Sequence, residues 1–199
     1  GSLMSTYLHD NKLRLKSKGS LFSEQALAAM KWLDSQPEFK DALYMLALDD
    51  WTVNLEWCSP VHRIVLGYPE AHLKVLNVRH NDDGHYMPRA SVEDVFYNMK
   101  DRLVNVIKAD DPASFVASVS GMTDVEGFVV LLASGQRIKV KCDWYLSLHH
   151  AKDSVNNPRR LFEAILDEGI DDLRSLFHTD EVAMMKIDQM QQKVDSLYN

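Results

Sequence analysis

The sequence predicts an α+β protein in which antiparallel strands and helices fill residues 1–150 and helices alone fill residues 151–199. Three observations support this prediction. Residues 51–57 alternate strictly between apolar and polar side chains, as a strand with one buried face does. Two segments, 6–17 and 125–141, place strand-forming residues on both sides of a turn. The final part of the chain shows helical periodicity and no strand signal.

The composition is that of an ordinary folded protein, because 46% of the 199 residues are hydrophobic and 26% are charged. The formal net charge of −7 excludes a uniformly basic surface that coats nucleic acid, so contact with polyphosphate requires a local cluster of Lys and Arg. No apolar run is long enough to cross a membrane, and no membrane partner is expected. The cysteines, Cys58 and Cys142, have no partner at disulfide-framework or zinc-site spacing, so a reducing, cytoplasmic location is expected.

The first half of the chain is expected to alternate between strands and helices. A hairpin is predicted around His9–Asn11, and its second strand carries basic residues at every second position up to Lys18. Serines precede the first helix and a proline opens the second, both common at helix starts. Gly84 closes a strong turn after the last strand of this part. The expected strands are Thr6–Leu8, Leu13–Ser17, Trp51–Trp57, Arg63–Leu66 and Leu73–Val78, and the expected helices are Glu24–Leu33 and Pro37–Leu48.

The second half is expected to be mainly helical, with one hairpin. Ser91, Asp111, Asn157 and Thr179 are predicted helix caps. The segment from Glu181 has a thin apolar stripe, so we expect it to pack poorly and to be cleaved first by a protease. The expected helices are Ser91–Lys108, Pro112–Val119, Pro158–Glu168, Ile170–Phe177 and Asp180–Leu197, with a further helix from Asp143, and the hairpin joins Val125–Leu132 to Arg137–Lys141.

Charged side chains on predicted strands form an ordered series along the chain. Lys18 precedes a glycine, Glu56 lies in the centre of the alternating strand, Glu126 precedes a glycine and a buried strand, and Lys139 and Lys141 share one face of the next strand. Each is ordinary by itself, because strand Glu and Lys side chains usually face solvent. Their order, however, is the motif order of covalent nucleotidyltransferases, the ligases and capping enzymes.

The similarity extends beyond motif order. Blocks spaced over nearly the whole chain resemble the tRNA-repairing RNA ligases of T-even bacteriophages. These blocks are Gly1–Tyr7, Lys16–Ser20 with Ser23–Leu27, Arg63–Leu66, Asn77–Arg79, Glu126–Val129, Lys139–His149, Asn157-Pro158 with Leu161-Phe162, and Asp171–Leu173. The resemblance implies a nucleotidyltransferase core in residues 1–150 and the start of an all-helical RNA-reading domain in residues 151–199.

The resemblance also implies roles for individual residues. Lys139 and Lys141 are expected to hold the α-phosphate of ATP, Lys18 to contact the nucleotide, and Glu56 to bind the ribose. Glu126 is expected to bind Mg²⁺, since a carboxylate beside phosphate suits that ion. The implied activity joins RNA 5′-phosphate and 3′-hydroxyl ends, with tRNA or other structured RNA as partner. Candidates for the wall of the adenine site are Tyr68, Leu76 and Val78.

The nucleophile motif is the main departure from the family. Family members attach AMP to the lysine of Lys-x-Asp-Gly-Ser, and Gly1-Ser2 corresponds to the end of that motif or is a cloning remnant. Lys18 is an unsuitable substitute, because its surroundings match a later family block. The printed chain is therefore expected to be inactive in self-adenylylation. A noncatalytic nucleotide-binding or RNA-binding module, and a ligase or capping enzyme with another acceptor, are the alternatives.

Other reactive side chains have weaker claims to function. Paired histidines, His149 and His150, lie near a helix start without a third metal ligand at suitable spacing, and His62 is isolated. Cys58 lacks a surrounding His and acid, so a packed thiol is the expected role.

Overall fold

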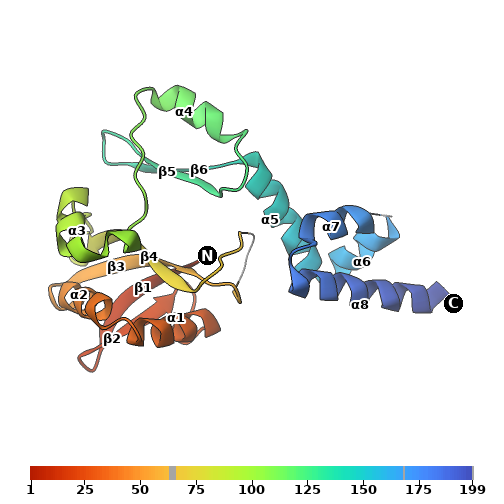
Figure 1. Cartoon of the computed structure of the whole chain (residues 1–199), viewed down its shortest axis with the longest axis horizontal. Helices are drawn as coiled ribbons and strands as arrows, with labels where there is room; N and C mark the ends of the chain where they lie inside the picture. Colours follow the sequence, from red (N-terminus) through yellow and green to blue (C-terminus); the bar gives the residue numbers. More distant parts are fainter. Residues whose placement is uncertain (63–65, 168, 199) are drawn as a thin grey trace. The chain divides into compact units, whose positions relative to one another are not determined.

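The computed structural model describes residues 1–62, 66–167 and 169–198. The chain forms two compact units (Figure 1). The first unit comprises residues 1–63 and 67–108, and the second comprises residues 64–66 and 109–199. The predicted strand Arg63–Leu66 lies almost entirely outside the described residues.

A four-stranded antiparallel sheet forms the centre of the first unit. Its strand order is β2-β1-β3-β4. The strands are β1 (Ser2–His9), β2 (Lys12–Ser17), β3 (Trp51–Cys58) and β4 (His72–His80). The predicted first hairpin is confirmed, and its tight turn places Asp10 and Asn11 at positive φ, which Asp and Asn tolerate better than most residues.

Two helices, α1 (Glu24–Asp34) and α2 (Pro37–Leu48), cover one face of this sheet (Figure 1). The Ser23 hydroxyl accepts a hydrogen bond from the backbone N–H of Ala26, so the predicted cap of α1 is confirmed. Alternate strand residues meet apolar helix residues to form the core. Its fully buried members include Met4, Leu33, Leu43, Val53, Leu55 and Leu73.

The predicted helix Ser91–Lys108 is wrong. A shorter helix, α3 (Arg89–Val95), is followed by the 3₁₀ segment η1 (Tyr97–Arg102), and extended chain follows. The break allows Phe96 to become fully buried against Phe39, and it allows Leu103 to lie beside β4 in a parallel bridge. Burial of these apolar side chains outweighs the helical propensity of the segment.

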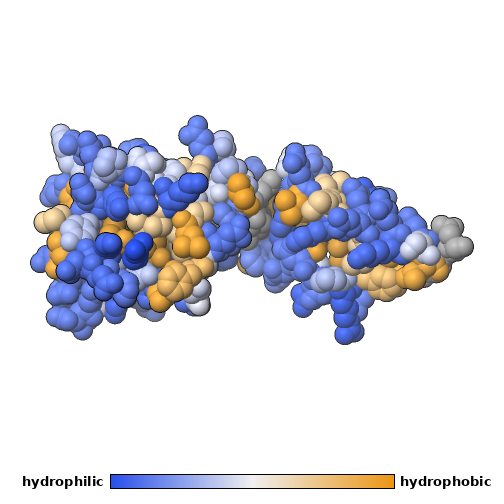
Figure 2. Space-filling model, turned by 90° about the horizontal axis from the view of Figure 1, so that it is seen from below, coloured by the Kyte–Doolittle hydropathy of each residue, from blue (hydrophilic) through white to orange (hydrophobic). Residues whose placement is uncertain are grey.

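The other face of the sheet is polar. Ser5 donates a hydrogen bond to Asn54, and Asn54 donates one to Asn77, so three neighbouring strands are linked by side chains. On the side of the molecule that Figure 2 shows, hydrophilic side chains dominate and apolar residues lie in separate patches.

The second unit begins with a small α/β layer. Helix α4 (Pro112–Val119) is capped by Asp111, as predicted, and it accompanies the hairpin β5 (Gly127–Leu131) and β6 (Arg137–Lys141). One face of the hairpin packs through Phe128 and Val140, while Val129 and Leu131 on the other face are exposed. The expectation that this first strand is buried is therefore wrong, because a two-stranded sheet covered on one side leaves its other side open.

The rest of the second unit is helical. It consists of α5 (Asp143–Asn156), α6 (Pro158–Leu166), α7 (Ile170–Phe177) and α8 (Glu181–Tyr198). Asn157 caps α6 as predicted, whereas the cap of α8 comes from Asp180 and not from Thr179. A buried ion pair joins Asp180 to Lys152 of α5. Ala183, Ile187 and Val194 of α8 are buried in the helical core, so the expectation that this helix packs poorly is wrong.

The two compact units divide at residues 108 and 109, whereas the sequence predicts a boundary between family domains near residue 150. The observed division separates groups of residues that contact one another, whereas the predicted one separates a nucleotidyltransferase core from a helical domain. The predicted boundary therefore stays a prediction. Within the described parts of the chain, no helix has the length and apolar character needed to cross a bilayer.

Candidate active site

The residues predicted to carry chemistry fall into two sets. Lys18, Glu56 and Tyr68 belong to the first unit, and Glu126 with the lysines of β6 belongs to the second. The set in the second unit forms a contacting cluster, and we describe it first.

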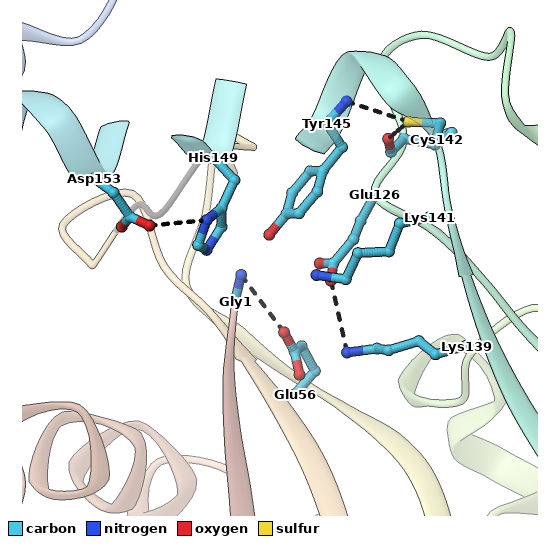
Figure 3. Close-up of polar contacts among 10 residues, drawn as sticks. Gly1, Glu56, Glu126, Lys139, Lys141, Cys142, Tyr145, His149 and Asp153 are labelled. Atoms are coloured by element: carbon cyan, nitrogen blue, oxygen red, sulfur yellow. Dashed lines mark hydrogen bonds and ion pairs between the residues drawn. The ribbon is translucent and has the colours of Figure 1, made fainter. Parts of the chain in front are cut away.

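Glu126 lies at the start of the β5–β6 hairpin and pairs with two lysines. Lys139 and Lys141 occupy alternate positions of β6 and share one of its faces, as the sequence predicts. The Glu126 Oε1 atom lies 3.1 Å from Lys141 Nζ and 3.8 Å from Lys139 Nζ (Figure 3). Lys141 is partly covered, with 29% of its side chain exposed, whereas Lys139 is 66% exposed. Lys139 is thus the more accessible of the two cations to a ligand.

Gly127 explains how the hairpin brings these charges together. Its φ of +141° lies outside the range that side-chain-bearing residues readily adopt. A Cβ atom at this position would lie 2.1 Å from the carbonyl oxygen of Val140 and 2.7 Å from the Cα of Lys141. The missing side chain therefore lets the backbone beside Glu126 approach β6 closely, which gives a physical reason for the Glu-Gly pair.

Cys142 fixes the end of the hairpin from the other side. Its backbone N–H donates to the carbonyl of Glu126, and its thiol donates to the carbonyl of Val125 at 2.9 Å. The same sulfur accepts from the backbone N–H of Tyr145 at 3.4 Å and so caps α5 (Figure 3). The fully buried thiol is a structural connector between strand and helix.

Electrostatics keep the Glu126 carboxylate ionised. Burial favours its neutral form and raises the pKa, but the hydrogen bond and positive charge of Lys141, together with the charge of Lys139, have the opposite effect and are stronger. The net result is that the pKa of Glu126 lies below its usual range. The cluster at neutral pH is one carboxylate between two ammonium groups.

Sequence reasoning missed Tyr145 and the role of its helix face. The ring of Tyr145 lies under Lys141, whose Nζ is 4.7 Å from the ring centroid, a cation–π contact. His149 is one turn further along α5, and its Nδ1 lies 3.4 Å from Asp153 (Figure 3). The spacing of four between Tyr145, His149 and Asp153 was visible in the sequence and places the three on one helix face.

In the first unit, Glu56 lies on the polar face of the sheet. Strand register places it opposite Leu3 of β1 and Lys74 of β4, and its Oε1 is 3.5 Å from the amino group of Gly1 (Figure 3). Lys18 is exposed in a bend just beyond β2, whose last residue, Ser17, pairs with Met4. Ser17, which precedes Lys18, thus lies opposite Met4 on one side of β1, and Glu56 lies opposite the adjacent residue, Leu3, on the other side.

The adenine-wall candidates have different surroundings. Tyr68 hydrogen-bonds to Cys58, and its ring meets that of His72 edge-on at 5.8 Å. Leu76 is the extra residue where the β3–β4 register shifts. Val78 is fully buried in the core on the helix-covered face, so it is unavailable to a ligand and this candidate is wrong. The extra residue in β4 shifts the alternation of buried and exposed side chains by one position. Once that shift is known, the alternation predicts that Val78 is buried.

Two further reactive side chains considered from the sequence, Cys58 and His62, are packed. Burial raises the pKa of the Cys58 thiol, although the hydrogen bond to Tyr68 opposes the rise, so this thiol is a poor nucleophile at neutral pH. His62 accepts a hydrogen bond from the Trp57 indole at 3.3 Å, which gives it a structural role. A groove of about 420 Å³ beside β2 and α1 contains none of the predicted site residues.

The Glu126 cluster has the chemistry of an anion site with an adjacent place for a cation. Two ammonium groups on one strand face can bind phosphate oxygens, and an ionised carboxylate between them can hold a divalent ion or orient an ammonium group. Such preorganised charge is the main requirement of phosphoryl and nucleotidyl transfer.

The chain is similar in sequence or fold to a family model, to a viral protein and to a solved structure. Residues 152–198 match the family model described as T4 RNA ligase 1, C-terminal domain. The chain is 26% identical over 191 residues to a protein described as a bifunctional polynucleotide kinase/RNA ligase of Autographa californica nuclear polyhedrosis virus, covering 89% of this chain and 27% of that relative. Its fold resembles a structure described as an ATP-dependent DNA ligase of Aquifex aeolicus, with a TM-score of 0.52 and 12% identity, over 100% of this chain and 57% of that one. The α+β fold is thus one that an ATP-dependent ligase structure shares.

Proposed function

We propose, from the premise that this chain is a relative of RNA ligases of the T4 RNA ligase 1 type, that it is part of an ATP-dependent enzyme joining RNA 5′-phosphate and 3′-hydroxyl ends. The chain spans about a quarter of the length of its viral relative, so the proposal concerns the whole protein to which these residues belong. We further propose repair of tRNA or other structured RNA, in the cytoplasm of the cell that makes it, where the two free cysteines remain reduced.

The observation that carries the proposal is the cluster of Glu126, Lys139 and Lys141. In the proposed reaction a lysine Nζ attacks the α-phosphorus of ATP, a P–N bond forms and pyrophosphate leaves. AMP then passes to the RNA 5′-phosphate, and the RNA 3′-hydroxyl attacks that phosphate and releases AMP. Each step moves negative charge on phosphate oxygens, which fixed ammonium groups stabilise more strongly in a covered site than in water.

The lysines of β6 take the α-phosphate in this proposal. Lys141 is held by Glu126 and by the Tyr145 ring, so its ammonium group is already oriented before ligand binds. Lys139 is more exposed and is only loosely paired at 3.8 Å, so it can turn toward phosphate at little cost. We assign nucleotide contacts to Lys18, Glu56 and Tyr68 from the family resemblance.

Glu126 fits the part of a Mg²⁺ ligand. Mg²⁺ is usually bound through one or two carboxylates together with substrate phosphates, and Glu126 offers one ionised, partly buried carboxylate beside two phosphate-binding cations. When bound, the ion neutralises charge on phosphate oxygens. Glu126 itself holds Lys141 in place.

The presence or absence of the lysine nucleophile determines whether this 199-residue chain can adenylylate itself. They contain no Lys-x-Asp-Gly sequence, so we propose that this chain alone does not adenylylate itself. A longer product of the same gene with such a lysine is expected to form the lysyl-AMP adduct.

The test compares the printed chain with that longer product. Both are incubated with α-³²P-labelled ATP and Mg²⁺ and then separated on a denaturing gel. We expect acid-labile label on the longer product, transfer of the label to 5′-phosphorylated RNA, and no label on the printed chain. Label on Lys16 or Lys18 of the printed chain would contradict the proposal, and a longer product that binds ATP or RNA without labelling would favour a noncatalytic binding module.

A further inference from the structure

The turn after β4 brings two histidines and an aspartate together in the first unit. The backbone N–H of His80 donates to the carbonyl of His85 at 2.9 Å, and that of Gly84 donates back to His80 at 3.1 Å. Gly84 has a φ of +75°, which permits this tight reversal. The loop therefore starts and ends with a histidine, and Asp83 lies between them.

The ligand atoms of these three residues lie within 4.8 Å of one another. His80 Nδ1 is 3.4 Å from Asp83 Oδ1, and His85 Nδ1 is 2.6 Å from the same oxygen. Neighbouring ligand atoms around a tetrahedral Zn²⁺ ion are about 3.3 Å apart, given metal–ligand distances of about 2.0 to 2.1 Å. The first pair already has this separation, and the second needs to widen by only about 0.7 Å.

His80 is anchored in a way that suits a ligand. It lies opposite Trp51 in the β3–β4 ladder, and the Trp51 ring meets both histidine rings edge-on with centroid separations of 4.9 Å. Its Nδ1 atom is buried and makes no hydrogen bond within the described residues, although Asp83 Oδ1 lies 3.4 Å away. A buried nitrogen without a hydrogen bond is costly, and a bound cation removes that cost.

Asp83 and His85 complete the set from the solvent side. Their side chains are 64% and 53% exposed, so an ion has direct access to the loop. The Asp83 carboxylate also accepts a hydrogen bond from the backbone N–H of His85 at 3.1 Å, which orients it within the loop. Two imidazoles and one carboxylate form a donor set that favours Zn²⁺ and similar transition metals over Mg²⁺, which prefers oxygen ligands throughout.

We propose that His80, Asp83 and His85 form a binding site for one Zn²⁺-class divalent cation, with water in the fourth position. The site ties the turn after β4 to the start of β3 through Trp51. It uses none of the residues assigned to nucleotidyl transfer and does not rest on the proposed function.

Zn²⁺ binding to the full chain tests the proposal, by calorimetry after removal of metal with a chelator. We expect one ion per chain, and affinity reduced by about tenfold or more in Asp83→Asn and in His85→Ala, since even outer-shell changes cost 10-fold to 100-fold. Both residues are exposed, so both variants are expected to fold, which circular dichroism verifies. His9→Ala is the matched control, because His9 and Asp10 form an exposed pair at 3.5 Å for which the described part of the chain supplies no third ligand.

A second readout locates the ion. Ni²⁺ is expected to quench tryptophan fluorescence in the wild-type chain, and Trp51→Phe is expected to remove most of that quenching while Ni²⁺ still binds. Zn²⁺ affinity that stays within twofold of wild type in both ligand variants would overturn the proposal. An equal loss in His9→Ala, or displacement of Zn²⁺ by millimolar Mg²⁺, would also overturn it.

Discussion

The two lysines of β6 differ in how firmly they are held, and this difference determines what each contributes. Lys141 touches Glu126 and the Tyr145 ring and is mostly covered, whereas Lys139 projects into solvent. Their shared face follows from strand periodicity, so the sequence predicts it. The Tyr145 contact could not be predicted in the same way, because it depends on the angle at which α5 leaves the hairpin, and a buried thiol of Cys142 sets that junction.

We expect Lys139→Ala and Lys141→Ala to slow adenylylation in the longer product, each costing roughly 2 to 4 kcal/mol of transition-state stabilisation. The measurement is the single-turnover rate of adduct formation. Arg137→Ala is the matched control, because Arg137 lies on the same face of β6 but two residues further from Glu126. Circular dichroism should show a folded protein in all three variants. Unfolding of the lysine variants with normal residual activity would show that these lysines are structural.

The lowered pKa of Glu126 predicts a pH dependence of stability. A carboxyl group whose pKa is lower in the folded state stabilises the fold above its unfolded pKa of about 4.3, and this contribution disappears as the pH falls through the folded pKa. The difference in free energy of unfolding between wild type and Glu126→Gln should therefore be constant from pH 7 to about pH 5.5 and shrink below about pH 4. Urea unfolding at several pH values measures it, and a difference that grows on acidification contradicts the assignment.

At the scale of elements, the sequence correctly predicts helices and strands whose signals are local. The prediction fails where packing against other elements determines the conformation of a segment. Helix starts at Ser23, Asp111 and Asn157 follow from side-chain caps and are confirmed. The helix expected over Ser91–Lys108 breaks, because Phe96 and Leu103 reach the core of the sheet. These two residues are buried only because the folded sheet and its helices provide contacts for them, and the sequence of the segment itself does not show those contacts.

The hairpin β5–β6 is the element whose geometry most directly depends on one residue. We expect Gly127→Ala to destabilise the protein by about 1 to 3 kcal/mol, because the new Cβ meets backbone atoms of β6 and the φ angle is unfavourable. The distance between Glu126 and Lys141 should increase together with this loss of stability. Gly121→Ala is the control, since a Cβ there meets no atom within 4 Å. Thermal unfolding measures both variants, and equal melting temperatures would show that the hairpin adapts easily.

At the scale of the whole molecule, the division into two compact units is the feature that the sequence did not indicate. The expected boundary near residue 150 follows a change from mixed to helical patterns, whereas the observed units follow contacts. The β5–β6 hairpin packs with α4 and with the start of α5, so the strands of the predicted core are shared between both units. Which neighbouring elements group into one unit depends on side-chain packing between them, which periodicity does not encode.

The unit boundary determines where a protease should cut first. Residues 104–110 have no helix or strand, and Val106, Ile107 and Lys108 are exposed, so trypsin is expected to cleave after Lys108. Helix α8 buries Ala183, Ile187 and Val194, so its own tryptic sites at Lys186 and Lys193 should be protected. Mass spectrometry of a short digestion should therefore show fragments 1–108 and 109–199. Earlier cleavage at Lys186 or Lys193 would mean that α8 is loosely packed, and earlier cleavage within residues 127–141 would mean that the hairpin carrying the candidate site is not a stable part of its unit.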